Sequence, residues 1–156
     1  MSRSKVRLLH GPPVHPPVKN YQIIEHTADL ALRVYAKDLK GLFRNAAVAV
    51  FEISAEKISS KNPPQKESLP LEQKAATLDE LFINWLNELL SLSATREMVF
   101  TDFKINKINE HALEATVTGE AFSGYRINKE IKAATYSGLK IENSGSDWQA
   151  EVILDV

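Results

Sequence analysis

The sequence contains no cysteine among its 156 residues. Disulfide bonds, thiolate zinc sites and cysteine nucleophiles are therefore excluded. A chain of this length builds a hydrophobic core without such cross-links. The lack of cysteine also fits a reducing compartment, where disulfides are rare.

Long hydrophobic runs are missing as well. No run approaches the roughly 18 apolar residues that a membrane-spanning helix needs, and the first residues lack the apolar centre of a secretory signal peptide. We therefore expect a soluble, cytoplasmic protein with no membrane partner.

Neither sign of charge dominates. The 19 Lys and Arg residues nearly balance the 20 Asp and Glu residues, which gives a net charge of −1. No overall positive field attracts nucleic acid, so any contact with RNA is expected to be local or to pass through a partner. The content of 44% hydrophobic and 25% charged residues is that of an ordinary globular domain.

The first twenty residues are rich in proline and in positive charge. Two pairs of adjacent prolines favour extended backbone and oppose helix formation. We expect residues 1–20 to form a flexible, proline-rich basic arm and residues 21–156 to form a single domain. A contact of the arm with RNA or with a partner is the alternative.

Two segments have the periodicity of amphipathic helices. Asp38 is a favourable N-cap for the first, in which apolar residues recur at helical spacing over residues 39–51. Thr77 and Glu80 form a capping box before the second. Trp85 lies on the apolar side of this second helix, where we expect it to be part of the core rather than a platform for a ligand.

Alternation of apolar and polar residues predicts strands in the rest of the domain. The sequence therefore predicts an α+β fold, a single domain in which the two helices pack on a mixed, largely antiparallel sheet. We expect strands at residues 21–24, 30–35, 67–74 (an edge strand, because it contains Pro70), 103–105, 113–117, 139–141 and 148–154, and loops at 54–65 and 126–138, the latter basic with an aromatic residue.

The polar stretch Glu25-His26-Thr27-Ala28-Asp29 separates the first two predicted strands. A polar break between two strands needs a turn or a bulge, and such places often carry functional side chains. The simpler interpretation is that Thr27 and Asp29 only satisfy backbone groups within a tight turn.

The chain ends on Asp155 and Val156, within its last predicted strand. The side chain of Asp155 and the terminal group of Val156 place two carboxylates on adjacent residues, which repel unless a cation or a donor lies between them. If this strand runs beside the one that follows the polar stretch, Asp29 joins them. Three carboxylates without thiols suit Ca²⁺, Mg²⁺ or Mn²⁺. A frayed terminus with solvated charges is the alternative.

Four segments together resemble the archease family. They are YQIIEHTAD at residues 21–29, KDLKGLFRNAAVAVF at 37–51, LFINWLNELL at 81–90 and IKAATYSGLKIENSGSDWQAEVILDV at 131–156. The combination of the HTAD motif with a C-terminal Asp-Val is the specific part of this resemblance.

The resemblance implies a function as well as a fold. Archeases are small α+β proteins that activate the GTP-dependent tRNA-splicing RNA ligase, promoting its guanylylation and multiple turnover, and they are chaperone-like cofactors rather than enzymes. Their metal site, of the calcium type, corresponds here to Asp29, Asp155 and Val156. Close to this site, His26 would orient a carboxylate, contact the ligase or only cap a strand, and Glu25 and Thr27 would contact the partner or support the metal ligands. The tRNA would be reached through the ligase.

Two features depart from the family pattern. Thr135-Tyr136-Ser137 stands where the family has a TYH sequence, which casts doubt on any role for a histidine there. The arm before Tyr21 is longer than in compact members of the family.

Two other functions are compatible with the sequence. A metal-dependent hydrolase of phosphoesters would use Asp29 and His26 around a bound water, but no second dense polar motif supplies the rest of an active site. A small RNA-binding module would use the arm and residues 126–138, and the near-zero net charge argues against it.

Overall fold

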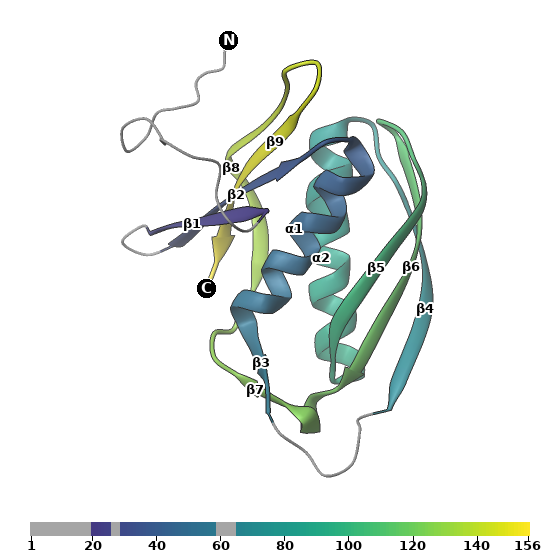
Figure 1. The fold of residues 1–156 in the computed structure, drawn as a ribbon, viewed down its shortest axis with the longest axis vertical. Helices are drawn as coiled ribbons and strands as arrows, with labels where there is room; N and C mark the ends of the chain where they lie inside the picture. Colours follow the sequence, from purple (N-terminus) through teal and green to yellow (C-terminus); the bar gives the residue numbers. More distant parts are fainter. Residues whose placement is uncertain (1–19, 26–28, 59–64) are drawn as a thin grey trace.

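The computed structural model describes residues 20–25, 29–58 and 65–156. Within these ranges two helices lie between two antiparallel sheets, as Figure 1 shows, and a short two-stranded sheet lies at one end. The strands are β1 (Tyr21–Glu25), β2 (Asp29–Ala36), β3 (Ala55–Lys57), β4 (Lys66–Lys74), β5 (Met98–Ile108), β6 (Ala112–Ala121), β7 (Tyr125–Ile127), β8 (Ala133–Asn143) and β9 (Trp148–Asp155); the helices are α1 (Leu39–Ser54), α2 (Leu78–Arg96) and a 3₁₀ turn at Phe122–Gly124.

Both helices begin where their capping residues predict. The Asp38 carboxylate accepts a hydrogen bond of 2.7 Å from the Gly41 amide at the start of α1. The Thr77 hydroxyl accepts one of 3.1 Å from the Glu80 amide at the start of α2. Each bond satisfies an amide that has no partner within the helix.

The first sheet has the strand order β1-β2-β9-β8, and all its pairings are antiparallel. The last strand of the chain therefore lies beside β2, the strand that follows the polar stretch. One face of the sheet packs on the helices through buried residues that alternate along each strand; these are Leu30, Leu32, Val34, Ala150, Val152 and Leu154.

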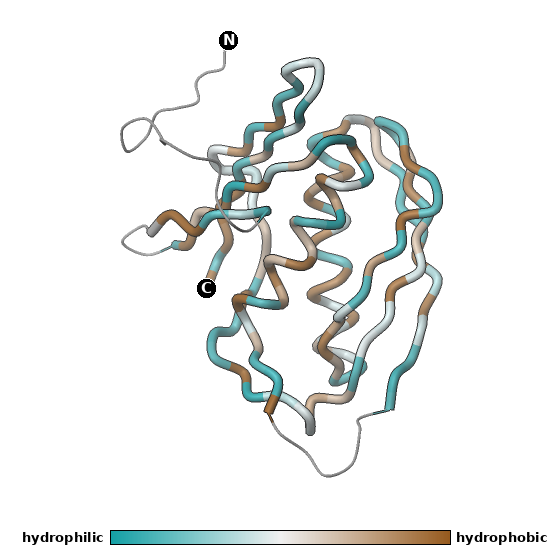
Figure 2. The backbone as a smooth tube through the Cα atoms, viewed as in Figure 1, coloured by the Kyte–Doolittle hydropathy of each residue, from teal (hydrophilic) through white to brown (hydrophobic). Residues whose placement is uncertain are grey.

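The second sheet has the order β4-β6-β5 and covers the other side of the helices. The turn between β5 and β6 is closed by Asn109, whose side chain accepts hydrogen bonds from the amides of His111 and Ala112. Pro70 lies in β4, at the edge of this sheet, where the missing amide costs no ladder bond. Hydrophobic and hydrophilic residues alternate along these strands in Figure 2.

Trp85 lies at the centre of the core. Its side chain is fully buried, and its indole N–H donates a hydrogen bond of 2.9 Å to the Phe43 carbonyl oxygen of α1. The Trp85 ring meets Phe103 of β5 edge-on, with 6.3 Å between ring centroids. This residue therefore joins both helices to the second sheet, as expected for a core residue rather than a ligand platform.

The predicted fold class is confirmed, since two helices pack on antiparallel sheets in one domain. The single mixed sheet that we expected is instead divided, and every pairing among the described strands is antiparallel. The loop predicted at 54–65 contains β3, and its residues 59–64 lie outside the described ranges. The prediction of a loop at 126–138 is wrong at both ends, because β7 extends to Ile127 and β8 begins at Ala133.

Other parts of the sequence-based account are not described. The predicted arm, residues 1–19, lies outside the described ranges, as do His26, Thr27 and Ala28. Among the residues that are described, no helix is long and apolar enough to cross a membrane.

Candidate functional site

Asp29 and Asp155 face each other at one end of the first sheet. They are directly opposite partners in the antiparallel pairing of β2 with β9, and both are exposed. Directly opposite residues point to the same side of a sheet, with Cβ atoms about 4.5–5.5 Å apart. Their neighbours Leu30 and Leu154 point into the core, so the two carboxylates lie on the outer face of the sheet.

The end of β9 is also held from its other side. Asp155 pairs with Ala133 of β8, and the amide of Lys132 donates a hydrogen bond of 2.7 Å to the Asp155 carbonyl oxygen. Val156 follows, half-buried and packed against the core. The last residues are therefore fixed between two strands, and the alternative of a frayed terminus is wrong for the backbone of Asp155.

The same outer face carries an ion pair two rows away. Arg33 pairs with Glu151 in the ladder, and its Nη2 lies 2.9 Å from Oε1 of that glutamate. The one row between them on this face holds Ala31 and Ile153. Because Glu151 already neutralises Arg33, this guanidinium does not balance the charges of the aspartate pair, and neither aspartate forms an ion pair with another described residue.

The donor set of the aspartate pair fits a hard divalent cation. Two carboxylates opposite each other are destabilising without a counter-charge, and carboxylate oxygens are the ligands that Ca²⁺, Mg²⁺ and Mn²⁺ prefer. The described ranges contain no group of three or more His, Cys, Asp or Glu side chains suited to a metal. Further ligands would have to come from Val156, from other backbone groups or from water.

The remaining residues of the polar stretch are placed only in part. Glu25 ends β1 and pairs with Leu30 of β2, so its backbone lies one residue from Asp29 along the ladder. His26 and Thr27 lie outside the described ranges, and their supporting roles stay predictions.

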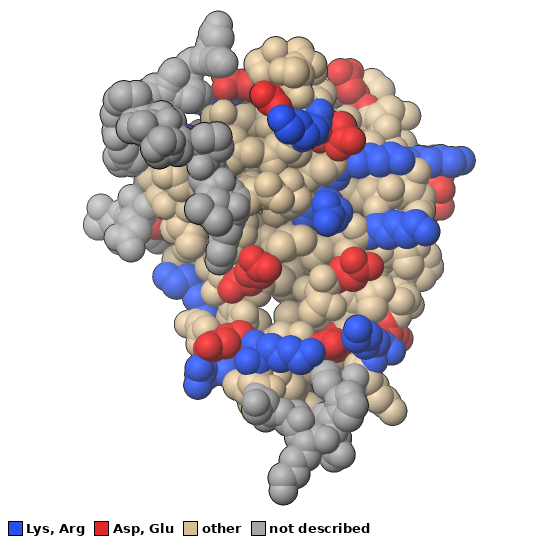
Figure 3. All heavy atoms as spheres, in the orientation of Figure 1, with Lys and Arg blue, Asp and Glu red and all other residues tan. Residues whose placement is uncertain are grey.

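The predicted basic surface at residues 126–138 is only partly basic. Arg126 is paired with Glu56 across the β3–β7 ladder, where the two residues stand opposite each other. On the face of the molecule seen in Figure 3, positive and negative side chains are interspersed over the described surface. This arrangement does not favour a module that binds RNA through a continuous positive patch.

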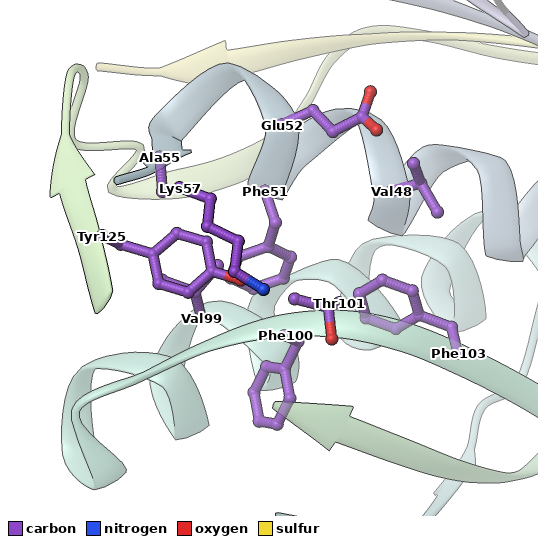
Figure 4. Close-up of a pocket in the computed structure, with 10 residues that line it drawn as sticks. All are labelled: Val48, Phe51, Glu52, Ala55, Lys57, Val99, Phe100, Thr101, Phe103 and Tyr125. Atoms are coloured by element: carbon purple, nitrogen blue, oxygen red, sulfur yellow. The ribbon is translucent and has the colours of Figure 1, made fainter. Parts of the chain in front are cut away.

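A separate small cavity of about 230 Å³ lies between α1, β3, β5 and β7. Figure 4 shows aromatic rings in its wall, with Lys57 and Tyr125 side by side and the Glu52 side chain pointing away from the rings. Its lining shares no residue with the aspartate pair; it consists of Val48, Phe51, Glu52, Ala55, Lys57, Val99, Phe100, Thr101, Phe103 and Tyr125.

A buried carboxylate behind this cavity was not anticipated from the sequence. Glu120 of β6 is almost fully buried; it accepts a hydrogen bond of 2.5 Å from the Tyr125 hydroxyl and lies 3.4 Å from the Lys57 ammonium. The hydrogen bond from Tyr125, together with the charge of Lys57, lowers the pKa of Glu120 below its ordinary value. Burial and the same carboxylate raise the pKa of Tyr125. These contacts fasten the β3–β7 sheet to the second sheet.

Two other groups show the same kind of coupling at the C-terminal end of α1, near the same cavity. Burial, followed by a hydrogen bond of 3.0 Å to Glu52, raises the pKa of Tyr21 to about 12. The contact ties β1 to the last turn of α1. Since Glu52 also lines the cavity, the carboxylate there is already engaged by Tyr21.

Comparison with known proteins places the chain in one family. The Archease protein family (MTH1598/TM1083) matches residues 21–156. The chain is 34% identical to the protein archease of Methanosarcina mazei over 146 residues, covering 88% of this chain and 97% of that one. It is 32% identical to the protein archease of Sulfurisphaera tokodaii over 142 residues, covering 89% and 100%.

Solved structures agree with this assignment. The solution structure of Methanobacterium thermoautotrophicum protein 1598 superposes with a TM-score of 0.62 at 27% identity, covering 88% of this chain and 99% of that one. The crystal structure of an archease and possible chaperone from Thermotoga maritima superposes with a TM-score of 0.61 at 21% identity, covering 91% and 100%, which bears on the fold alone. From the family match, the sequence identities and the shared fold, we conclude that the chain belongs to the archease family.

Proposed function

We propose that this protein is a non-catalytic activator of the GTP-dependent tRNA-splicing RNA ligase, which promotes guanylylation and multiple turnover of that enzyme. Membership of the archease family supports the assignment. The structural observation that most supports this function is the position of Asp29 directly opposite Asp155 on the outer face of the first sheet. This pair gives the protein an exposed acidic group that a partner can reach.

We further propose that the pair holds a divalent cation, Ca²⁺ or else Mg²⁺ or Mn²⁺. Asp29, Asp155 and the terminal carboxylate of Val156 would bind it. A bound cation would supply positive charge at the surface that we expect to meet the ligase, and this charge would attract phosphate or carboxylate groups. The residues of this chain contribute rigid placement, because Asp155 is held between β2 and β8.

The proposed partner is a protein rather than RNA. The exposed position of Asp29 and Asp155 at one end of the first sheet supports a protein partner, because a protein surface can reach both carboxylates. The interspersed charges of the described surface and the net charge of −1 leave tRNA to be bound by the ligase. The carboxylate pair would act on the ligase and would need no substrate pocket of its own.

A multiple-turnover ligation assay tests the proposal. Purified ligase is given GTP, Mg²⁺ and RNA ends in excess over enzyme, with and without this protein. Asp29→Ala and Asp155→Ala should abolish the increase in turnover while the fold stays cooperative. Asp147→Ala is the matched control, because this exposed aspartate lies at the other end of the β8–β9 hairpin.

Normal activation by both site variants would contradict the proposed role of the pair. Hydrolysis of phosphoesters by the protein without any ligase would contradict the non-catalytic assignment and favour a hydrolase. Tight binding of tRNA to the protein alone, with a steep dependence on salt, would favour an RNA-binding module.

A further inference from the structure

Asn87 of α2 makes a contact that extends the first sheet. Its side-chain amide donates a hydrogen bond of 3.1 Å to the Ala134 carbonyl oxygen. Its side-chain oxygen accepts one of 2.7 Å from the Ala134 amide. β8 is the edge strand of the sheet, so the asparagine occupies the position at which a further strand would pair with Ala134.

The segment that Asn87 holds is separated from the rest of β8. Residues 133–135 pair with the end of β9, and pairing resumes only at Lys140, opposite Glu151. Four residues, 136–139, therefore stand opposite Val152 alone, and Gly138 adopts a φ of +68° within this bulge. The bulge interrupts the ladder between the β8–β9 turn and residues 133–135, so this segment is not held by continuous pairing from the turn.

The same short segment sets the position of Asp155. Ala133 pairs with Asp155, and the amide of Lys132 is bonded to the Asp155 carbonyl oxygen. On its other side, Asp155 is held only by its pairing with Asp29, which is the last pair of the β2–β9 ladder. Terminal residues fray unless they are tied down, and repulsion between two opposed carboxylates favours separation.

We propose that Asn87 is a positioning residue for the carboxylate pair: it clamps residues 132–135 to α2 and so holds Asp155 opposite Asp29, ready for a cation. This inference rests on the proposed function, because it assumes that the pair binds a metal. Asn87 sits between Leu86 and Leu89, both fully or almost fully buried, so the clamp is anchored in the core. The bond pattern needs one donor and one acceptor on the same side chain, which an amide provides.

The clamp is tested with two variants of the full-length protein. Asn87→Ala and Asn87→Leu both remove the amide. The first leaves a cavity, whereas the second fills the space with an apolar side chain of similar shape, so the two variants do not share the same cause of misfolding. The control is Ser93→Ala, which removes a buried hydrogen bond from the same helix to Met98, at a site remote from the aspartates. Ca²⁺ affinity is measured by calorimetry at a temperature at which urea titration shows every variant to be folded.

Both Asn87 variants should bind Ca²⁺ about 10- to 100-fold more weakly than the unaltered protein, the range found when groups behind metal ligands are removed. Ser93→Ala should bind it unchanged, even where it loses as much stability. Equal affinity in the Asn87 variants and the control would overturn the clamp while leaving the metal site intact. No Ca²⁺, Mg²⁺ or Mn²⁺ binding by the unaltered protein would instead overturn the metal site, and the positioning role with it.

Amide hydrogen exchange separates positioning from general stability. In both Asn87 variants the amides of Lys132 and Ala134 should lose protection, while those of Val152 and Leu32 in the middle of the sheet keep it. Unchanged protection of Lys132 would overturn the clamp irrespective of metal binding, since its amide bonds to Asp155.

Discussion

The ion pair between Arg33 and Glu151 provides a quantitative test of the packing on the outer face. Both Nε and Nη2 of Arg33 donate to Oε1 of Glu151, at 3.1 and 2.9 Å. The side chains keep only 7% and 18% of their accessible surface. Removing one member would therefore leave the other charge largely buried and without its partner.

The size of the effect follows from this burial. Breaking a fully buried pair costs about 3–5 kcal/mol. Because Glu151 retains some contact with water, we expect Arg33→Met to lower the free energy of unfolding by about 2–3 kcal/mol. For a domain of this size that corresponds to a fall in Tm of about 6–9 °C.

Urea unfolding of four proteins measures the effect: the unaltered chain, Arg33→Met, Glu151→Leu and the double variant. The double variant should be more stable than either single one, because apolar side chains of similar volume replace a buried pair at little cost. Lys37→Met removes an exposed ion pair with Asp147 and should change stability by less than about 0.5 kcal/mol. A double variant whose loss equals the sum of the single losses would refute the reasoning.

Three further predictions concern the core, the buried carboxylate and the terminus. Trp85→Phe should cost about 2–3 kcal/mol in urea unfolding, because it leaves a cavity and removes the bond to Phe43; a loss below 0.5 kcal/mol would contradict the central role of this residue. The pKa of Glu120 is lowered in the folded state, so its contribution is complete above about pH 4.5 and is lost as the pH falls through the folded pKa. The difference in free energy of unfolding between the unaltered protein and Glu120→Gln should therefore narrow as the pH falls below about 4.5. A difference that widens there would show that folding raises the pKa of Glu120 rather than lowering it. Extending the chain beyond Val156 turns the terminal carboxylate into an amide and should weaken Ca²⁺ binding in calorimetry; equal affinities of extended and unextended chains would remove Val156 from the site.

The local features of the fold could be predicted from the sequence because they depend on neighbouring residues. Asp38 and Thr77 cap helices where expected, since a capping side chain acts over three residues. The turn at Asn109 and the alternation that follows it define a hairpin for the same reason. Helical spacing predicts that Trp85 lies in the core, and it is fully buried there.

Features that depend on distant segments could not be predicted in this way. The strands divide into separate sheets according to which strands pair with each other on either side of the helices. The alternation of apolar and polar residues along one strand carries no information about its partner. Glu120 lies beyond the strand predicted at 113–117, and its sequence neighbours do not indicate that Lys57 of β3 and Tyr125 of β7 pack over it. The sequence predicts a loop over residues 133–138 because the bulge before Lys140 interrupts the regular pattern of a strand. They belong to β8, and three of them pair with β9.

The candidate site was predicted in one respect. From the residues alone, a shared site required the last strand to lie beside the one that follows the polar stretch, a condition that the sequence leaves open, and the family resemblance named the residues. The register confirms the neighbourhood of Asp29 and Asp155. The contribution of Asn87 was missed, because its helical position gives no sign that its amide bonds to a strand 47 residues further along the chain.

Crystals of the unaltered protein equilibrated with Mn²⁺ test the central claim most directly. Anomalous scattering locates the metal without any assumption about its ligands. We predict an anomalous peak within coordinating distance, about 2.0–2.6 Å, of carboxylate oxygens from both Asp29 and Asp155, and none there in crystals of Asp29→Asn. A peak bound elsewhere, or no peak at saturating Mn²⁺, would contradict the claim that these two residues form one cation site.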